Sequence, residues 1–353
     1  MKKITYLLAL SAFTLVSCGT SSSETSSNSP SSEDTSKLTS EVIDTSTLNV
    51  LSPTGIPALA FYDQGSNKNF VTAVASTIPP NFAASGSKSY DVIVFDGIGG
   101  LNNITANKRD YALAKWISGG TFYVVSTKHT KEETFNSEST INGFVKTGIA
   151  SLSFMKLAKD NWNWGDYSSS NKITFSDAVS DVKNNLVSNP DSYDYYIVAE
   201  PVLTSARGAL KGKGVTLNVI YNIQEEWAKY YDNALVPAAG LFVNKNSYQE
   251  KKETIDKFLD EVDERIVNAI DNPQVAVDAL NAYEAIDTTN DNDCQVRFGF
   301  TPALVGTLQK DGANKFNLIK NSAVTSINDV ANSFRNILGQ PNFPDTSFLI
   351  RYL

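Results

Sequence analysis

The sequence predicts an α/β fold with two lobes. Short runs rich in Val, Ile, Phe and Tyr alternate with segments whose apolar residues recur at helical spacing. A strand–turn–helix pattern occurs twice, at residues 54–61 and 147–154. The last third of the chain has mainly helical spacing. Alternation of the two element types is typical of sheets covered by helices, and the repeated pattern indicates one such layer in each lobe.

The expected strands are short, apolar and bounded by turn residues. They cover residues 48–51, 90–95, 121–126, 143–146, 193–199, 215–221 and 239–243. Residues 111–117 fit either a short helix or a strand. Asp96-Gly97 and Gly99-Gly100 are expected to end the strand at 90–95 sharply.

The expected helices follow most of these strands. They cover residues 56–70, 149–159, 176–188, 224–231, 250–270, 275–285, 302–309 and 330–338. The segment 250–270 is the clearest helix, because Ile255, Phe258, Leu259, Val262 and Ile266 lie on one helical face.

The N-terminus has the pattern of an export signal. Lys2 and Lys3 precede an apolar run that ends at Val16, which is too short to span a bilayer comfortably. Residues 15–19 read Leu-Val-Ser-Cys-Gly and resemble a lipobox, in which the Cys is acylated, for example with palmitate, and becomes the new N-terminus. We therefore expect a signal peptide at residues 1–17 and lipidation at Cys18. The alternative is an ordinary secretory signal followed by an incidental Cys.

Residues 18–46 are expected to form a tether. The segment is rich in Ser and Thr, with interspersed Glu and Asp, and has too few apolar residues to build a core. A lipid anchor with a disordered tether would hold the folded part near the extracytoplasmic face of the cell membrane.

Composition excludes several classes of function. The formal net charge is −8, and removal of Lys2 and Lys3 with the signal makes it −10, which argues against nucleic acid and against docking to anionic lipid through a basic patch. If Cys18 carries lipid, Cys294 has no intramolecular partner, so no disulfide framework is expected. The only histidine, His129, stands in a polar stretch without a metal-binding pattern. We expect no cofactor, and no second apolar run is long enough for a channel or permease.

The repeated pattern reads Thr-Gly-Ile-x-x-Leu-x-Phe. Thr54, Gly55 and Phe61 occur in the first copy, and Thr147 and Gly148 in the second. The first turn of a helix has unpaired N–H groups, and glycine lets a ligand approach them closely. Two such turns could face each other across a cleft and bind a small molecule. The alternative is that each Thr-Gly is an ordinary helix cap and that the apolar residues belong to the core.

At three places the chain resembles a known family. The residues are the strand–turn–helix start at 50–61, the strand at 194–202 that ends in Glu200-Pro201, and the segment 227–259 with its long amphipathic helix. They are similar to solute-binding proteins of ABC importers with the type II periplasmic-binding fold. The branch is the one that handles nitrate, sulfonates, taurine and thiamine-precursor pyrimidines.

The resemblance implies a domain plan and a set of partners. Lobe 1 would comprise residues 47–127 and 236–353, and lobe 2 residues 128–235, with crossings near residues 127–142 and 231–238. The solute would lie in a cleft between the lobes, which close by hinge motion. The partners would be a small molecule, an ABC permease and its ATPase, and the membrane, and the protein would be a monomer that is not an enzyme.

Two carboxylates are the strongest single candidates for ligand contacts. Glu200 ends a buried strand and could accept hydrogen bonds from a ring N–H or an amine; otherwise it pairs with an arginine or caps a helix. Asp96 ends another strand, and strand ends line clefts in such sheets; otherwise it forms a turn. Phe61, Tyr62, Trp162 and Trp164 could stack on a flat ring, or belong to packed cores.

The ligand class stays open at this stage. Heterocycles such as pyrimidines, carboxylates, sulfonates and nitrate all fit. No arginine lies near either Thr-Gly turn, which weakens the sulfonate interpretation. Glu200 and the aromatics near the proposed cleft, together with the lack of arginine there, favour a small solute with a ring or an amide.

Two other classes of function have partial support in the sequence. A serine acyl-enzyme of the penicillin-recognising type would need Ser-x-x-Lys before Lys-Thr-Gly in a set order, and here Lys146-Thr147-Gly148 precedes Ser169-Ser170-Asn171. A surface lipoprotein acting in adhesion or protein interaction is the stronger alternative, and a large exposed apolar patch would favour it.

Overall fold

The computed structural model of the chain describes residues 43–86, 89–131, 138–167, 170–232, 235–284, 302–312, 316–320 and 335–337. The chain divides into a unit Met1–Val42 and a unit Ile43–Leu353, and every described residue belongs to the second. The expected signal peptide, Cys18, the tether up to residue 42 and Cys294 lie outside the described residues. So does the helix expected at 330–338, apart from residues 335–337.

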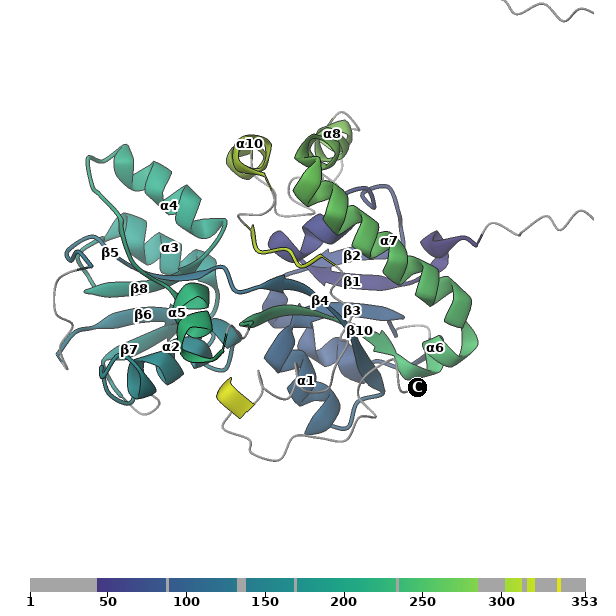
Figure 1. Cartoon of the computed structure of the whole chain (residues 1–353), viewed down its shortest axis with the longest axis horizontal. Helices are drawn as coiled ribbons and strands as arrows, with labels where there is room; N and C mark the ends of the chain where they lie inside the picture. The colour runs from purple at the N-terminus through teal and green to yellow at the C-terminus, as the bar shows by residue number, and fades with distance from the viewer. Residues whose placement is uncertain are drawn as a thin grey trace, which may run out of the picture. The chain divides into compact units, whose positions relative to one another are not determined.

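The first lobe contains a five-stranded sheet with the order β2-β1-β3-β10-β4. β1 runs parallel to β2 and β3, whereas β10 is antiparallel to both β3 and β4 (Figure 1). These strands are largely buried, as expected for Val- and Ile-rich runs covered on both faces. Their bounds are Val50–Pro53 (β1), Phe70–Ala73 (β2), Val92–Asp96 (β3), Tyr111–Gly119 (β4) and Pro237–Asn244 (β10).

The second lobe contains another five-stranded sheet, with the order β7-β6-β8-β5-β9. β6 is parallel to β7 and β8, and β5 is antiparallel to β8 and β9. The bounds are Phe122–Ser126 (β5), Ile141–Phe144 (β6), Ile173–Ser176 (β7), Tyr195–Ala199 (β8) and Asn218–Asn222 (β9). Strand order and direction therefore match in the two sheets: β3 corresponds to β8, and β10 corresponds to β5.

Helices cover both faces of the first sheet. α7 packs with the 3-10 helix η2 on one face, and α1 lies on the other (Figure 1). The buried face of α7 carries Ile255, Phe258, Val262 and Ile266, which confirms the predicted amphipathic helix. The first-lobe helices are η2 (Ile56–Phe61), α1 (Gly97–Thr105), α6 (Lys245–Glu250), α7 (Lys252–Asp271), α8 (Pro273–Glu284) and α10 (Pro302–Asp311).

The second sheet is covered in the same way. α3 and α4 pack on one face through Val182, Leu186, Leu203 and Leu210. α2 and α5 belong to the apolar cluster that also contains α1 and β10, so this cluster is shared by the two lobes. The second-lobe helices are α2 (Ile149–Asp160), α3 (Val179–Ser188), α4 (Val202–Lys211) and α5 (Ile223–Tyr230).

The chain crosses between the sheets twice. It leaves the first sheet at the end of β4 and enters the second at Phe122, so the first crossing lies at about residue 120 and not in the expected segment 127–142. The expectation was wrong because β5 pairs with β8 and β9, which puts 122–127 in the second lobe. The chain returns between α5 and β10, in the segment where the second crossing was expected.

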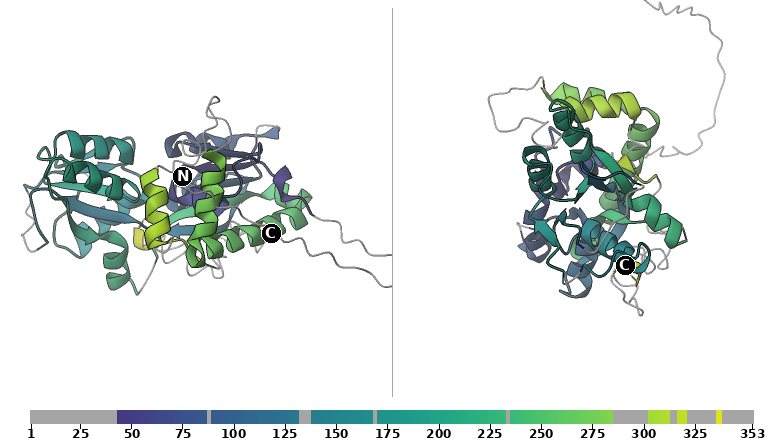
Figure 2. Two further views of the ribbon diagram at one scale, coloured as in Figure 1. Left: turned by 90° about the horizontal axis from the view of Figure 1, so that it is seen from above. Right: turned by 90° about the vertical axis from the view of Figure 1, so that its left-hand side faces the viewer.

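A later segment is hydrogen-bonded to the first crossing. The Gly119 N–H donates to the Asn317 carbonyl (2.8 Å), and the Asn317 side chain donates to the Gly120 carbonyl (2.6 Å). Ser118 and Leu318 form an antiparallel bridge. Nearby along the chain, α10 contacts α8 of the first lobe and α4 of the second (Figure 2). Residues after the second lobe thus contribute to the join between the lobes.

One local expectation was wrong and another was confirmed. The helix expected at 56–70 ends at Phe61, and turns stabilised by Asn67 lead into β2. The strand β3 ends at Asp96, as the Asp96-Gly97 pair predicted, and the glycines that follow begin α1, with Asp96 as its N-cap.

The glycines of α1 allow close packing against aromatic rings. A Cβ on Gly97 would lie 2.3 Å from the Trp116 ring and 2.5 Å from the Pro237 carbonyl oxygen. A Cβ on Gly100 would lie 2.1 Å from the Phe242 ring. These contacts explain why glycine, and no larger residue, occupies these two positions of α1.

Residues 43–46, which were expected to belong to the tether, contact α7. Lys257 Nζ donates to the Ile43 carbonyl (2.9 Å), and Thr45 Oγ1 donates to Glu261 Oε2 (2.7 Å). The ordered part of the chain therefore begins before residue 47. Among the described residues we find no helix with the length and apolarity needed to span a bilayer.

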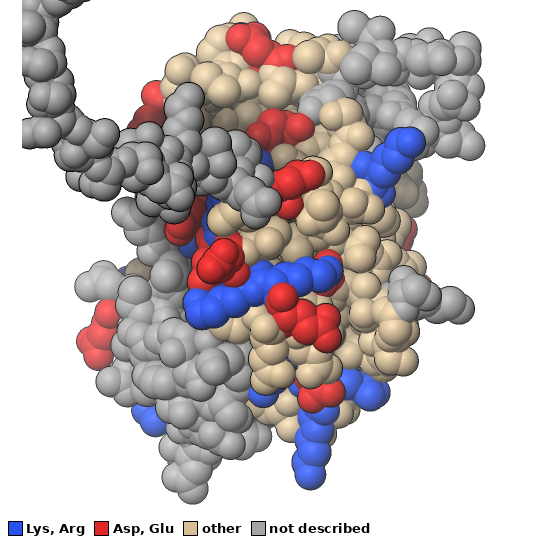
Figure 3. All heavy atoms as spheres, turned by 90° about the vertical axis from the view of Figure 1, so that its right-hand side faces the viewer, with Lys and Arg blue, Asp and Glu red and all other residues tan. Residues whose placement is uncertain are grey.

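Charges of both signs are mixed on the surface that Figure 3 shows. Lys and Arg side chains lie beside Asp and Glu, and the described residues seen there form no patch of one sign. Lys252 pairs with Asp256 (2.5 Å) and Lys251 with Asp91 (3.0 Å).

We predict that alanine changes the free energy of unfolding differently at two helical glycines. Gly97→Ala should lower the free energy of unfolding by about 1–3 kcal/mol, because the new methyl group overlaps Trp116 and the backbone of Pro237. Gly208→Ala in α4 is the control: its Cβ would meet nothing within 4 Å, so it should be neutral or stabilise by up to about 1 kcal/mol. Urea denaturation of both variants tests this, and equal effects would contradict the packing argument.

Candidate functional site

The two Thr-Gly turns occupy equivalent places in the two sheets. Thr54 and Gly55 join β1 to η2, and Thr147 and Gly148 join β6 to α2. Both threonines are exposed. The repeated sequence pattern thus corresponds to a repeated position in the fold.

The backbones of the two turns nevertheless differ. Gly55 has φ 96°, which favours glycine, and precedes a 3-10 helix of only six residues. Gly148 has φ −79° and precedes an α-helix of twelve residues. Only α2 is long enough to present the helix N-terminus that sequence analysis expected in both lobes.

Asp96 connects the two lobes. It is the last residue of β3 and the N-cap of α1, where Oδ1 accepts a hydrogen bond from the Gly99 N–H (2.6 Å). Its other oxygen, Oδ2, accepts a hydrogen bond from the N–H group of Ile149 (3.1 Å). Ile149 is the first residue of α2, in the second lobe. One carboxylate therefore caps two helices, one from each lobe, beside the second Thr-Gly turn.

Burial raises the pKa of Asp96 to about 6, while hydrogen bonds from the backbone N–H groups of Gly99, Ile149 and Ile98 act in the opposite direction. The two helix N-termini each carry a partial positive charge of about half a unit. Together they lessen the cost of burying the charge but do not cancel it, since the pKa of Asp96 stays above its usual value.

Glu200 occupies the equivalent position in the second lobe, immediately after β8 and before α4. Its Oε2 accepts from the Thr204 N–H (3.1 Å) and its Oε1 from the Thr204 hydroxyl (3.0 Å). The residue is 5% exposed, and its N–H donates to the Thr121 carbonyl at the first crossing (3.0 Å). Of the two structural roles expected for Glu200, pairing with an arginine or capping a helix, the structure shows the helix cap. Unlike Asp96, Glu200 directs both oxygens to its own lobe.

The aromatic candidates lie in packed clusters. Phe61 has no exposed surface and packs against Phe70 (5.2 Å between ring centroids) and Phe258 (6.0 Å), so it is a core residue and cannot stack on a ligand in this structure. Trp162 stacks on Tyr221 (4.3 Å) and donates from Nε1 to Glu226 (3.2 Å).

Trp164 contacts Tyr195, the first residue of β8 (5.5 Å). Tyr195 lies at the end of β8 opposite to Glu200. Trp164 therefore contacts the start of β8, whereas Tyr221, the partner of Trp162, lies near the carboxyl end of β9.

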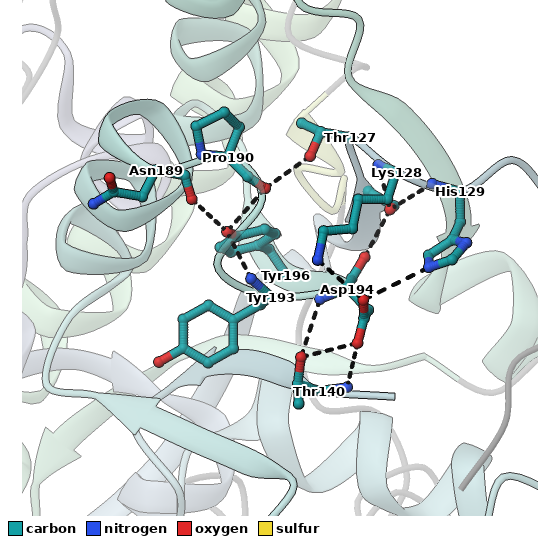
Figure 4. A network of polar contacts seen from close by, with 10 residues as sticks. Thr127, Lys128, His129, Thr140, Asn189, Pro190, Tyr193, Asp194 and Tyr196 are labelled. Carbon is teal, nitrogen blue, oxygen red and sulfur yellow. Dashed lines mark hydrogen bonds and ion pairs between the residues drawn. The ribbon is translucent and has the colours of Figure 1, made fainter. Parts of the chain in front are cut away.

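His129 belongs to a polar network at that same far end of the second sheet (Figure 4). Its Nε2 lies 3.8 Å from Asp194 Oδ1, and Lys128 Nζ lies 3.2 Å from the same oxygen. Asp194 Oδ2 accepts from the Thr140 N–H and hydroxyl. Burial alone would raise the pKa of Asp194, but the hydrogen bonds from Thr140 and Lys128 outweigh it and lower the pKa. The network joins the start of β8 to the ends of neighbouring strands.

No group of three or more His, Cys, Asp or Glu side chains suited to a metal ion occurs in the described part of the chain. Sequence reasoning missed Thr204, the partner of Glu200, and the backbone N–H groups that Asp96 caps. A signal for the first exists, since Glu200 is followed four residues later by a Thr. The partner of Asp96 in α2 has no signal in the sequence, because it depends on how two distant segments pack.

Comparison with known proteins identifies the fold. No protein-family model matches the sequence, and no curated protein matches it. Solved structures do match. An ABC transporter from Parabacteroides distasonis is 15% identical, with a TM-score of 0.57 over 86% of this chain and 98% of that one.

Two further structures give the same result. The ligand-binding component of an ABC-type import system from Staphylococcus aureus, with zinc bound, is 10% identical (TM-score 0.58, 86% and 95% coverage). The periplasmic aliphatic sulphonate binding protein SsuA from Escherichia coli is 9% identical (TM-score 0.56, 84% and 94% coverage). The chain thus has the two-lobed α/β fold of these proteins, which confirms the predicted fold class.

The raised pKa of Asp96 predicts a pH dependence of stability. The folded state keeps the Asp96 proton to about pH 6, whereas the unfolded chain loses it near pH 4. This group's contribution to the free energy of unfolding is therefore fully present below pH 4 and is lost as pH rises to 6, by up to about 3 kcal/mol.

Urea denaturation of wild type and Asp96→Asn between pH 4 and 7.5 isolates this contribution. Wild-type stability should fall relative to the variant across that window. Parallel curves for the two proteins would show that Asp96 has no raised pKa.

Proposed function

We propose that the protein is an extracytoplasmic solute-binding lipoprotein that captures a small molecule between its two lobes and delivers it to an ABC importer. The observation that carries this proposal is the pair of equivalent sheets, joined by two crossings, with Asp96 and Glu200 at equivalent strand ends. Solved structures that include the ligand-binding component of an ABC-type import system share this fold over more than four fifths of this chain.

The proposed binding site lies at the carboxyl ends of the parallel strands. Its residues are Thr54, Gly55, Asp96, Thr147, Gly148 and Glu200, and Phe61 is omitted because it is buried in the core. Ligands of α/β proteins bind at these strand ends. The polar atoms offered there are two carboxylates, two hydroxyls and the backbone of the glycine turns.

A neutral, N–H-bearing solute such as a small heterocycle or amide suits these groups best. The α2 N-terminus, which would attract an anion, already holds the Asp96 carboxylate. A sulfonate, carboxylate or nitrate would therefore add a negative charge beside an existing one. The sulphonate and zinc in the names of the neighbours describe those proteins.

The proposed anchor is a lipid on Cys18. Residues 18–42 would then form the flexible connection between the membrane and the ordered part that begins at Ile43. The importer's permease and ATPase are the proposed protein partners.

Solute binding can be tested directly. Native mass spectrometry of protein purified from its host should detect a co-purified small mass. A thermal-shift screen of pyrimidines, other heterocycles, amides, sulfonates and amino acids should give one clear upward shift, since ligand at 100 times its Kd stabilises by about 2.7 kcal/mol. Absence of a bound mass and of any shift would reject solute capture and favour a surface-interaction role.

The same assay tests the site. Asp96→Ala and Glu200→Ala should each weaken binding of the solute so found. Glu138→Ala is the control, because Glu138 is exposed, pairs with Lys172 (2.7 Å) and precedes β6, at the edge of the second sheet opposite to the carboxyl ends of the parallel strands. Unchanged affinity in both site variants would place the solute elsewhere.

The anchor predicts a change in partitioning. Wild-type protein expressed in its host should partition into the detergent phase of Triton X-114 and incorporate a labelled palmitate analogue. Cys18→Ser should partition into the aqueous phase without label, while Cys294→Ser should behave as wild type. Identical partitioning of wild type and Cys18→Ser would exclude the proposed lipid.

A further inference from the structure

Asp96 makes two hydrogen bonds with different consequences. The bond from the Gly99 N–H (2.6 Å) stays within the first lobe and caps α1. The bond from the Ile149 N–H (3.1 Å) joins residues 53 positions apart, in different sheets. The second bond exists only while β3 and the start of α2 are adjacent.

The second bond lies at the apolar junction of the two lobes. Ile149 is 3% exposed and belongs, with Phe154 and Trp227 of the second lobe, to the apolar cluster that includes Ile98 and Phe242 of the first. A first-turn N–H has no acceptor within its own helix. In an apolar junction, such a group is costly to leave unpaired.

The arrangement is one-sided. Glu200, which is equivalent to Asp96 in the second sheet, has both oxygens on Thr204 of its own lobe. The duplication of the fold thus does not require a carboxylate that reaches across, and the reach of Asp96 is specific to this position.

We propose that Asp96 is a latch between the lobes: its carboxylate caps the N-terminus of α2 and holds the two lobes together when no solute is bound. The latch involves only residues of the chain, so the proposal does not depend on which solute the protein binds. A charged hydrogen bond of this kind changes the ratio of joined to separated lobes by about tenfold to a hundredfold.

Asp96→Asn separates the two functions of the residue. Its side-chain oxygen still caps α1, because Asn is as good an N-cap as Asp. Its amide nitrogen cannot accept a hydrogen bond from Ile149. Asp181→Asn is the matched control, because it removes one charge from the first turn of α3, where Asp181 accepts from the Ala178 N–H within the second lobe (3.1 Å).

Hydrogen exchange of two amides provides the readout. In solute-free Asp96→Asn, the Ile149 amide should exchange about tenfold to a hundredfold faster than in wild type, while the Gly99 amide stays protected. Small-angle scattering should give a larger radius of gyration for this variant. Asp181→Asn should match wild type in both measurements.

Two results would overturn the latch: an Ile149 amide equally protected in wild type and Asp96→Asn, or an unchanged radius of gyration. If the Gly99 amide also loses protection, Asp96→Ser decides, since Ser keeps a cap on α1 with a single short oxygen. Selective loss at Ile149 supports the latch, and equal loss at both amides refutes it. None of these outcomes depends on whether a solute is found, so failure of the latch is distinct from failure of the proposed function.

Discussion

Hydrogen bonding at helix starts next to buried strands constrains this molecule more than any other feature. In each sheet the central strand, β3 or β8, leads into a helix whose first N–H groups are shielded from solvent. In each lobe a carboxylate at the end of that strand accepts a hydrogen bond from one of these N–H groups. In the first lobe the short Asp side chain leaves one oxygen for the neighbouring lobe. In the second lobe the longer Glu side chain folds back on Thr204. A difference of one methylene group accompanies the difference between a local cap and a contact between lobes.

The fold class and most elements could be predicted from the sequence because they depend on local periodicity. The apolar face of α7 and the buried run of β3 are examples. Errors arose where tertiary packing outweighs local preference. The helix expected at 56–70 ends at Phe61, because turns stabilised by Asn67 lead the chain into β2. The first crossing was misplaced because β5 looks like any apolar strand, and only its pairing with β8 assigns it to the second lobe.

The candidate site was predictable in position but not in contacts. The Thr-Gly turns and the two carboxylates do lie at strand-to-helix turns, as their spacing indicated. Phe61 followed the same pattern, yet its ring is in the core, because a side chain on the inner face of a short helix packs on the sheet. The Ile149 N–H is a backbone group, so its pairing with Asp96 leaves no trace in residue type. For the same reason the solute cannot be named from the sequence, since turns and backbone groups have little chemical individuality.

The interleaved path of the chain also has a consequence for biogenesis. β10 lies between β3 and β4 in the first sheet, although the whole second lobe separates it from them along the chain. Until residue 244 has been synthesised, β3 and β4 lack their common neighbour and expose unpaired strand edges, which promote aggregation. The second sheet, whose strands all lie within residues 122–222, has no such delay. The second lobe can therefore fold first, and the sheet of the first lobe can be completed against it.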